Sequence, residues 1–228
     1  MYPTLLDTVT TRADSRFRAA EQAGAVLFVT VLTAIAAQIS VPLPFTPVPF
    51  TFQPMVVLVG AAALGSRLGM SSQILYLAFG IAGLPVFAAS PVLPQGAARL
   101  LGPTGGYLMS YPFAAFVAGA LAERGFDRRY LTAVLAMVCG LAVVFLAGIL
   151  WLLIAGQPGR GLSGALAAGF FPFIIPDLLK LLVAAGVLPA LWKITGTNAH
   201  WLGQTPAETR TAENPRARST AAPRPGPH

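Results

Sequence analysis

Apolar residues dominate the chain between residues 21 and 193, where they form runs separated by short segments rich in proline, glycine or charge. The runs predict helices at residues 21–39, 54–64, 70–83, 105–122, 130–155 and 163–191. A helix that crosses a membrane needs about 20 mostly apolar residues, so the two shortest helices are expected to be tilted or to begin inside the protein. This pattern predicts an all-α membrane protein, a bundle of six transmembrane helices.

The composition agrees with a membrane protein and argues against a soluble domain or a nucleic-acid-binding protein. Hydrophobic residues make up 55% of the chain and charged residues only 10%, whereas soluble domains carry about 25% charged residues. The net charge of +7 comes from basic residues at the ends of apolar runs and in the C-terminal tail, so it indicates topology and not nucleic-acid binding. Cys139 lies in an apolar run and both histidines follow the last predicted helix, so we expect no disulfide, metal site or cofactor.

The basic residues also predict an orientation, because cytoplasmic segments of membrane proteins are enriched in lysine and arginine. With six spans and a cytoplasmic N-terminus, the segments assigned to the outside hold only Arg99 and Arg160. The chain is then a multi-pass protein of the cytoplasmic membrane with both termini in the cytoplasm. It comprises a cytoplasmic segment 1–20, a transmembrane domain 21–193 and a disordered cytoplasmic tail 194–228.

Asp177 and Lys180 stand inside the apolar segment 170–183, and no other ionisable residue is placed within a predicted span. Each costs about 2.5–3.5 kcal/mol at the middle of a bilayer, and their spacing puts both on one face of a helix. Pro172 and Pro176 have no N–H, so the carbonyls four residues before them lose their helical partners. Together these features predict a small-molecule site, with a structural ion pair between helices as the alternative.

The segment 41–54 alternates proline with other residues, which excludes a regular helix or a central strand. Irregular backbone close to a membrane is tolerated only where protein or a cavity shelters it. We therefore expect a stiff cap over the site, in which Thr51 and Gln53 can form hydrogen bonds. A plain connecting loop is the alternative.

The segment 102–107 opens the helix expected at 105–122 and contains Thr104, Gly105 and Tyr107. Its glycines allow close approach, and the free N–H groups and positive dipole at a helix start favour an anionic or carbonyl-bearing ligand. A simple glycine turn is the alternative.

The sequence gives no support for a nucleotide-binding site. Residues 159–164 match G-x-G-x-x-G, but they follow a membrane-length helix and not a strand, so the match is interpreted as a chance occurrence in a loop. The phosphate-binding pattern G-x-x-x-x-G-K-[ST] is absent from the sequence, so the chain cannot power uptake with ATP by itself.

Thr30 and Ala34 are small residues four positions apart on the first predicted helix. Small residues at this spacing let another helix backbone approach closely. The approaching helix could belong to this chain or to another subunit, and the spacing does not distinguish the two.

Three short motifs stand in order along the chain: Pro-Phe-Thr-Phe-Gln at 49–53, Gly-Pro-Thr-Gly-Gly-Tyr at 102–107 and Asp-Leu-Leu-Lys at 177–180. In a six-helix frame the chain resembles the BioY family, the biotin-binding membrane subunits (S components) of energy-coupling factor (ECF) transporters. The resemblance implies a bundle that captures biotin at its outer side. It also implies import with a transmembrane coupling subunit and two cytoplasmic ATPase subunits.

The resemblance further implies roles for individual residues. Thr30 and Ala34 look like the family's contact with the coupling subunit. The substrate-binding residues expected from the motifs are Asp177, Lys180, Gln53, Thr51, Thr104, Gly105 and Tyr107.

Biotin combines a carboxylate, a ureido group and an apolar bicycle. Lys180 can pair with the carboxylate, and Asp177 can accept ureido N–H bonds or orient Lys180, so the ends of the ligand stay unassigned. Two alternatives are a stand-alone proton- or ion-coupled carrier that titrates Asp177, and an S component for a different vitamin. An enzyme is not expected, because no second carboxylate and no histidine is placed inside a predicted span.

Overall fold

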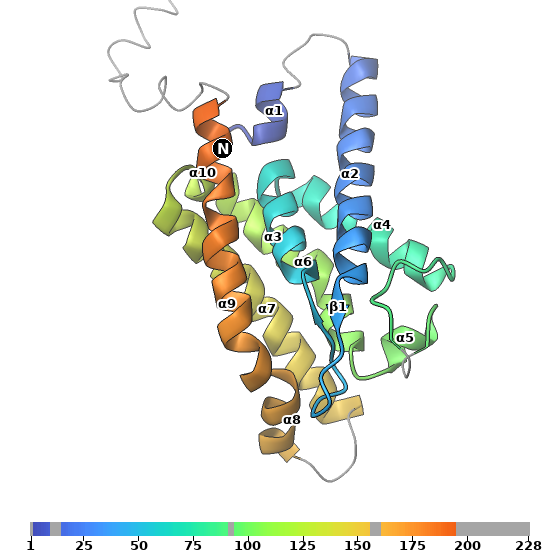
Figure 1. Cartoon of the computed structure of the whole chain (residues 1–228). Helices are drawn as coiled ribbons and strands as arrows, with labels where there is room; N and C mark the ends of the chain where they lie inside the picture. Colours follow the sequence, from blue (N-terminus) through green and yellow to red (C-terminus); the bar gives the residue numbers. More distant parts are fainter. Residues whose placement is uncertain (1, 10–14, 91–93, 156–160, 195–228) are drawn as a thin grey trace, which may run out of the picture.

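The computed structural model describes residues 2–9, 15–90, 94–155 and 161–194, which form a bundle of helices with a short hairpin at one end (Figure 1). The elements in chain order are α1 (Leu5–Val9), α2 (Ser15–Gln38), β1 (Ser40–Val41), β2 (Phe50–Thr51), α3 (Gln53–Leu64), α4 (Ser66–Ile81), α5 (Ala98–Leu101), α6 (Gly105–Ala122), the 3-10 helix η1 (Phe126–Arg128), α7 (Tyr130–Ala155), α8 (Gly161–Gly169), α9 (Phe171–Ala185) and α10 (Val187–Ile194).

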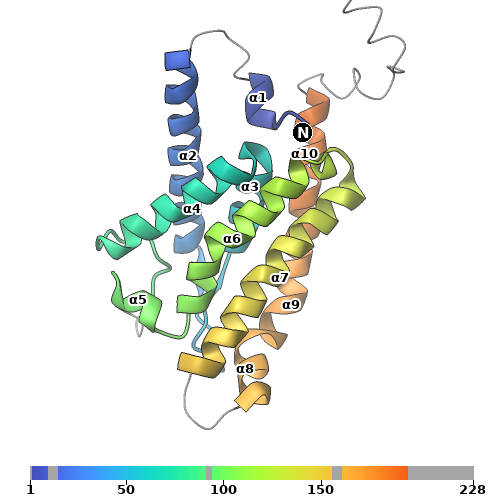
Figure 2. The same ribbon diagram turned by 180° about the vertical axis from the view of Figure 1, so that it is seen from behind.

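The two ends of the bundle carry different elements (Figure 1). The terminal end holds α1 and the last turn of α10, whereas the cap end holds the β1–β2 hairpin, α5 and α8. Helix α6 packs against α7 on one side and against α3 and α4 on the other, as the view from behind shows (Figure 2). This arrangement brings the three motif segments, which are far apart in the sequence, to the cap end.

Helix length separates the candidate membrane spans from two shorter helices. Four helical stretches within the described residues are long and apolar enough to cross a membrane: Phe17–Gln38, Gly105–Ala122, Tyr130–Ala155 and Gly161–Lys193. Helices α3 and α4 have 12 and 16 residues and are shorter than the usual span of about 20. The mostly helical membrane architecture agrees with the prediction, and the count of six spans is not confirmed.

Two predicted helix starts are wrong. Helix α2 begins at Ser15 instead of residue 21, and α4 begins at Ser66 instead of residue 70. The turn between α3 and α4 needs only Gly65, whose φ of 89° lies in the region that glycine adopts readily. The short helices α1 and α5 lie in segments for which no helix was predicted.

The single helix predicted at 163–191 is interrupted twice. Helix α8 ends at Gly169 before α9 begins, and α9 ends at Ala185 before α10 begins. Both interruptions fall where a proline removes a hydrogen bond, because Pro172 cannot donate to Ala168 and Pro189 cannot donate to Ala185. Three further predictions concern segments outside the described residues, namely the tail from residue 195 onward, residues 10–14, and the loop with Arg160.

The small residues of α2 pack against α4 within the chain. The side chain of Thr30 is 1% exposed, and its hydroxyl lies within hydrogen-bond distance of two acceptors, the carbonyls of Ser72 (2.9 Å) and Val26 (2.8 Å). Ala34 is half-buried against the core. Thr30 is therefore turned toward α4, and a contact of this pair with another subunit stays a prediction.

The terminal end is closed by the first residues of the chain. The Arg128 guanidinium lies 4.1 Å from the ring centre of Trp192 and donates to the Pro3 carbonyl at 3.1 Å. The Trp192 indole N–H donates to the Asp127 carboxylate at 2.6 Å. These contacts join α10 to the turn between α6 and α7, and so fix the far end of the α9–α10 segment.

We expect Gly119→Ala to lower the free energy of unfolding by about 1–3 kcal/mol, because it over-packs a backbone contact. A Cβ at Gly119 would lie 2.5 Å from backbone atoms of both Gly65 and Ser66, which cannot move independently of α3 and α4. Gly24 is the matched control, since a Cβ there meets nothing within 4 Å. Gly24→Ala should raise the melting temperature slightly through helix propensity, and a fall as large as that of Gly119→Ala would contradict this assignment.

Candidate functional site

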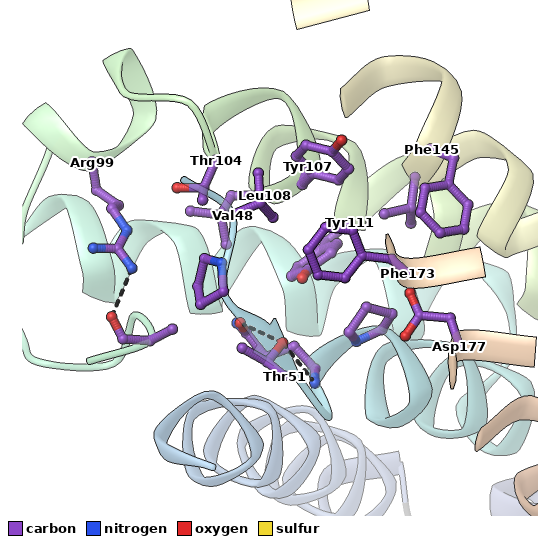
Figure 3. Close-up of a pocket in the computed structure, with 15 residues that line it drawn as sticks. Val48, Thr51, Arg99, Thr104, Tyr107, Leu108, Tyr111, Phe145, Phe173 and Asp177 are labelled. Carbon is purple, nitrogen blue, oxygen red and sulfur yellow. Dashed lines mark hydrogen bonds between the residues drawn. The ribbon is translucent and has the colours of Figure 1, made fainter. Parts of the chain in front are cut away.

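An internal pocket lies at the cap end, between the hairpin, the first turns of α3 and α6, and the facing sides of α7 and α9 (Figure 3). Most of its lining is apolar or aromatic, and a few polar groups converge on it, as is usual for small-molecule sites. The lining residues are Val48, Pro49, Thr51, Gln53, Pro54, Ala88, Arg99, Thr104, Tyr107, Leu108, Tyr111, Val144, Phe145, Phe173 and Asp177.

Two charged side chains of opposite sign form opposite ends of this pocket. Figure 3 shows Arg99 at one side and Asp177 at the other, with Val48 and Tyr111 between them. Arg99 is 1% exposed and Asp177 is 7% exposed, so both charges are shielded from bulk water. The pocket therefore suits a ligand with an apolar middle and a polar group at each end.

Arg99 was not predicted as a site residue, because the sequence analysis assigned it only to an external loop. It projects from α5, and its Nη2 donates to the Ala88 carbonyl at 2.7 Å. Burial lowers the pKa of Arg99, but a guanidinium stays protonated in proteins. A signal was present in the sequence: Arg99 is the single basic residue between Arg67 and Arg124, and it lies close before the glycine-rich motif.

Asp177 and Lys180 form the ion pair that their spacing predicts, with Nζ 2.5 Å from the carboxylate. Asp177 lines the pocket, whereas Lys180 lies beside it and does not. The Lys180 ammonium donates to the Thr51 carbonyl at 2.6 Å and lies 3.9 Å from the ring centre of Phe50. Lys180 thus fastens the hairpin to α9 and compensates the charge of Asp177.

Two backbone carbonyls at the break between α8 and α9 accept hydrogen bonds from side chains instead of from helical N–H groups. The Thr46 hydroxyl donates to the Ala168 carbonyl at 2.5 Å, and the Tyr107 hydroxyl donates to the Gly169 carbonyl at 2.8 Å. Pro172 leaves the Ala168 carbonyl without a helical donor, and the two side-chain contacts at the break hold the hairpin and one aromatic wall of the pocket in place.

The other predicted site residues divide into pocket and packing roles. Gln53 lines the pocket, donates to the Tyr76 hydroxyl at 2.6 Å and accepts from the Thr51 hydroxyl at 3.3 Å. Thr104 also lines the pocket, and its buried hydroxyl has no hydrogen-bond partner in the part of the chain that the structure describes. Gly105 does not line the pocket. A Cβ there would collide with the Leu100 carbonyl, so this glycine lets α6 begin directly against α5.

Comparison with known proteins identifies the family. A sequence model of the BioY family matches residues 9–197. The chain belongs to the BioY family. The resemblance drawn from the three motifs is thereby confirmed.

Two BioY proteins illustrate how close the similarity is. The "Probable biotin transporter BioY" of Pyrococcus horikoshii is 39% identical over 165 residues, which cover 72% of this chain and 92% of that protein. The "Biotin transporter BioY" of Thermotoga maritima is 38% identical over the same length and with the same coverage. A crystal structure described as the S-component for biotin from an ECF-type ABC transporter superposes with a TM-score of 0.69 and 26% identity, over 79% of this chain and 95% of that one.

Proposed function

We propose that this chain captures biotin at the outer side of the cytoplasmic membrane, as the substrate-specific subunit of an ATP-driven ECF-type importer, and that it is not an enzyme. The names of its BioY relatives and of the S-component that it resembles support this proposal. The observation that carries it is the pocket at the cap end, with Arg99 and Asp177 at opposite ends.

The charges of the pocket favour one orientation of biotin. The Arg99 guanidinium presents a planar set of donors that matches a carboxylate, so it is assigned to the valerate end. The Asp177 carboxylate can accept the ureido N–H groups, and the Thr104 and Gln53 side chains add polar partners. The apolar bicycle and chain would lie against Tyr107, Tyr111 and Phe173 in the middle of the pocket.

Two features support capture from outside and a need for partner subunits. Helix α1 and the last turn of α10, near the two described ends of the chain, lie at the end of the bundle opposite the β1–β2 hairpin (Figure 1). With the basic N- and C-terminal segments in the cytoplasm, the cap faces outward. Because no phosphate-binding loop occurs in the sequence, ATP must be used by other subunits, which we take to be a transmembrane coupling subunit and two ATPases.

The test of this function is calorimetric titration of four compounds into the purified, detergent-solubilised protein: biotin, biotin methyl ester, thiamine and riboflavin. We expect biotin to bind and thiamine and riboflavin not to bind. The methyl ester should bind at least about tenfold more weakly, because it cannot form the charged contact with Arg99. Tighter binding of another vitamin would show that this is an S component with a different substrate.

The buried carboxylate of Asp177 gives one reason to consider a second function, a carrier coupled to protons. Uptake of labelled biotin into proteoliposomes separates the two functions. We expect uptake only when the coupling and ATPase subunits and ATP are present. Uptake by this chain alone under an imposed pH gradient would favour the carrier.

A further inference from the structure

A segment without helix or strand, residues 85–89, crosses the cap end close to the pocket, and we refer to it as the strap. Its five consecutive backbone carbonyls all accept hydrogen bonds from side chains of other segments. The donors are Gln38 Nε2 to Pro85 and Phe87 (3.2 Å each), the Tyr76 hydroxyl to Val86 (3.1 Å), Arg99 Nη2 to Ala88 (2.7 Å) and the Ser40 hydroxyl to Ala89 (3.1 Å).

The path of the strap therefore depends on side-chain donors and not on a ladder of backbone hydrogen bonds. Its one large anchor is Phe87, which is 0% exposed and packs edge-on against Tyr76. The anchor is tight, because a Cβ at Gly80 would lie 2.0 Å from the ring of Phe87. The buried ring of Phe87 holds the middle of the strap against the bundle, and the carbonyl contacts hold the backbone on either side of it.

Two of these contacts connect the strap to residues that line the pocket. Ala88 lines the pocket and its carbonyl holds the guanidinium of Arg99, which lines the same pocket (Figure 3). The Tyr76 hydroxyl, which donates to Val86, also accepts the hydrogen bond of Gln53, a third lining residue. A displacement of the strap would therefore change the position of Arg99 and loosen Gln53.

Gln38 connects the strap to the outside of the bundle. It is the last residue of α2, it is exposed, and it is not part of the pocket lining. Its one side-chain amide group bridges the carbonyls of Pro85 and Phe87, on both sides of the carbonyl that Tyr76 holds. Loss of this amide would leave the first half of the strap with Tyr76 as its single side-chain donor among the described residues.

We propose that Gln38 is a positioning residue for ligand binding, which acts through the strap by holding Ala88 and Arg99 in their binding positions. The inference rests on the proposed function, in which Arg99 receives the ligand carboxylate. Gln38 itself does not touch the ligand.

Gln38→Leu removes the donors while keeping a side chain of similar bulk. We expect it to raise the dissociation rate constant of biotin by about five- to thirty-fold, which is at the lower end of the effect of losing two hydrogen bonds because Gln38 is exposed. Gln38→Lys should restore a rate constant close to the wild-type value, because an ammonium can donate to both carbonyls and is favoured at a helix C-terminus.

A double-mutant comparison distinguishes positioning from a general loss of stability. If Gln38 acts through Arg99, Gln38→Leu should change biotin dissociation less than about twofold in an Arg99→Met background. Thr33→Val is the matched control on α2. It removes a buried hydroxyl that donates to Val29 at 2.8 Å and accepts from Gln73 at 3.3 Å, so it should lower the melting temperature without changing dissociation. A wild-type dissociation rate in Gln38→Leu, or an equal change in both backgrounds, would overturn the proposal.

Amide hydrogen exchange of the ligand-free protein tests the contact of Gln38 with the strap without biotin. Gln38→Leu should accelerate exchange in residues 84–90 and in α5, which carries Arg99, and Gln38→Lys should not. Because this measurement needs no ligand, it tests the role of Gln38 even if the wild-type chain does not bind biotin. Failure of the wild-type chain to bind biotin would contradict the proposed function and not the effect of Gln38 on the strap. Unchanged exchange in α5 would overturn the positioning role.

Discussion

Arg99→Met is expected to weaken biotin binding by roughly thirty-fold to several-thousand-fold while leaving the weaker binding of biotin methyl ester almost unchanged. Truncating one partner of a buried charged contact typically costs about 2–5 kcal/mol, and each 1.4 kcal/mol is about a factor of ten in affinity. Arg99 is 1% exposed and lines the pocket, so a carboxylate paired with it would be shielded from water.

The methyl ester makes this experiment specific to the assigned end of the ligand. It lacks the charge that Arg99 is proposed to bind, so the variant should affect biotin far more than the ester. Arg67→Met is a suitable control, because Arg67 is an exposed arginine near the start of α4 and away from the pocket. An equal loss for biotin and the ester would show that Arg99 supports the pocket without contacting the carboxylate.

Much of the helical framework could be predicted from the sequence because membrane helices are long apolar runs with visible breaks. The helices at 105–122 and 130–155 have the predicted bounds, and Gly65 and the charged turn after α6 mark real chain reversals. The interruption at Phe170 was harder to predict. Pro172 indicates a missing hydrogen bond, but a proline often only bends a helix, and here the Thr46 and Tyr107 hydroxyls stabilise a complete break.

The isolation of Arg99 among the basic residues is visible in the sequence, but the role proposed for it depends on contacts between distant segments and could not be assigned from that signal alone. A basic residue in an external loop is ordinary, and only the fold places α5 beside the strap and the start of α6. The partner of its Nη2 is a backbone carbonyl, at Ala88, and a carbonyl carries no side-chain signal in a sequence. The five side-chain contacts of the strap could not be predicted for the same reason, because all their acceptors are backbone carbonyls.

Asp177 and Lys180 illustrate the opposite case, in which the pair was predictable but its orientation was not. Their spacing determines that they share a helix face, and the structure confirms the contact. Which member faces the pocket depends on the hairpin, because the Lys180 ammonium contacts the Thr51 carbonyl and the Phe50 ring, whereas Asp177 lines the pocket. The roles of both residues in binding stay predictions, and the following variants test them.

We expect Lys180→Met to lower both the stability and the biotin affinity, because it removes the contacts of the Lys180 ammonium with the Asp177 carboxylate and with the hairpin. The carboxylate of Asp177 loses its counter-charge, and breaking a buried ion pair in this way typically costs about 3–5 kcal/mol of stability. The Thr51 carbonyl loses its donor and the Phe50 ring loses its cation, so the hairpin wall of the pocket is released as well. Lys193→Met, which changes an exposed lysine in α10, is the matched control and should leave both properties unchanged.

The double variant Asp177→Asn with Lys180→Met separates the structural contribution of the pair from its contribution to binding. Removing both charges leaves no unpaired ion, and such replacements are often close to neutral for stability. The melting temperature should therefore return most of the way to the wild-type value, while biotin affinity stays low because the ureido acceptor at Asp177 has lost its charge. The measurements are calorimetric titration with biotin and thermal unfolding of the folded, detergent-solubilised variants. Wild-type affinity in folded Lys180→Met, together with a lowered melting temperature, would show that the pair serves only to hold the hairpin on α9.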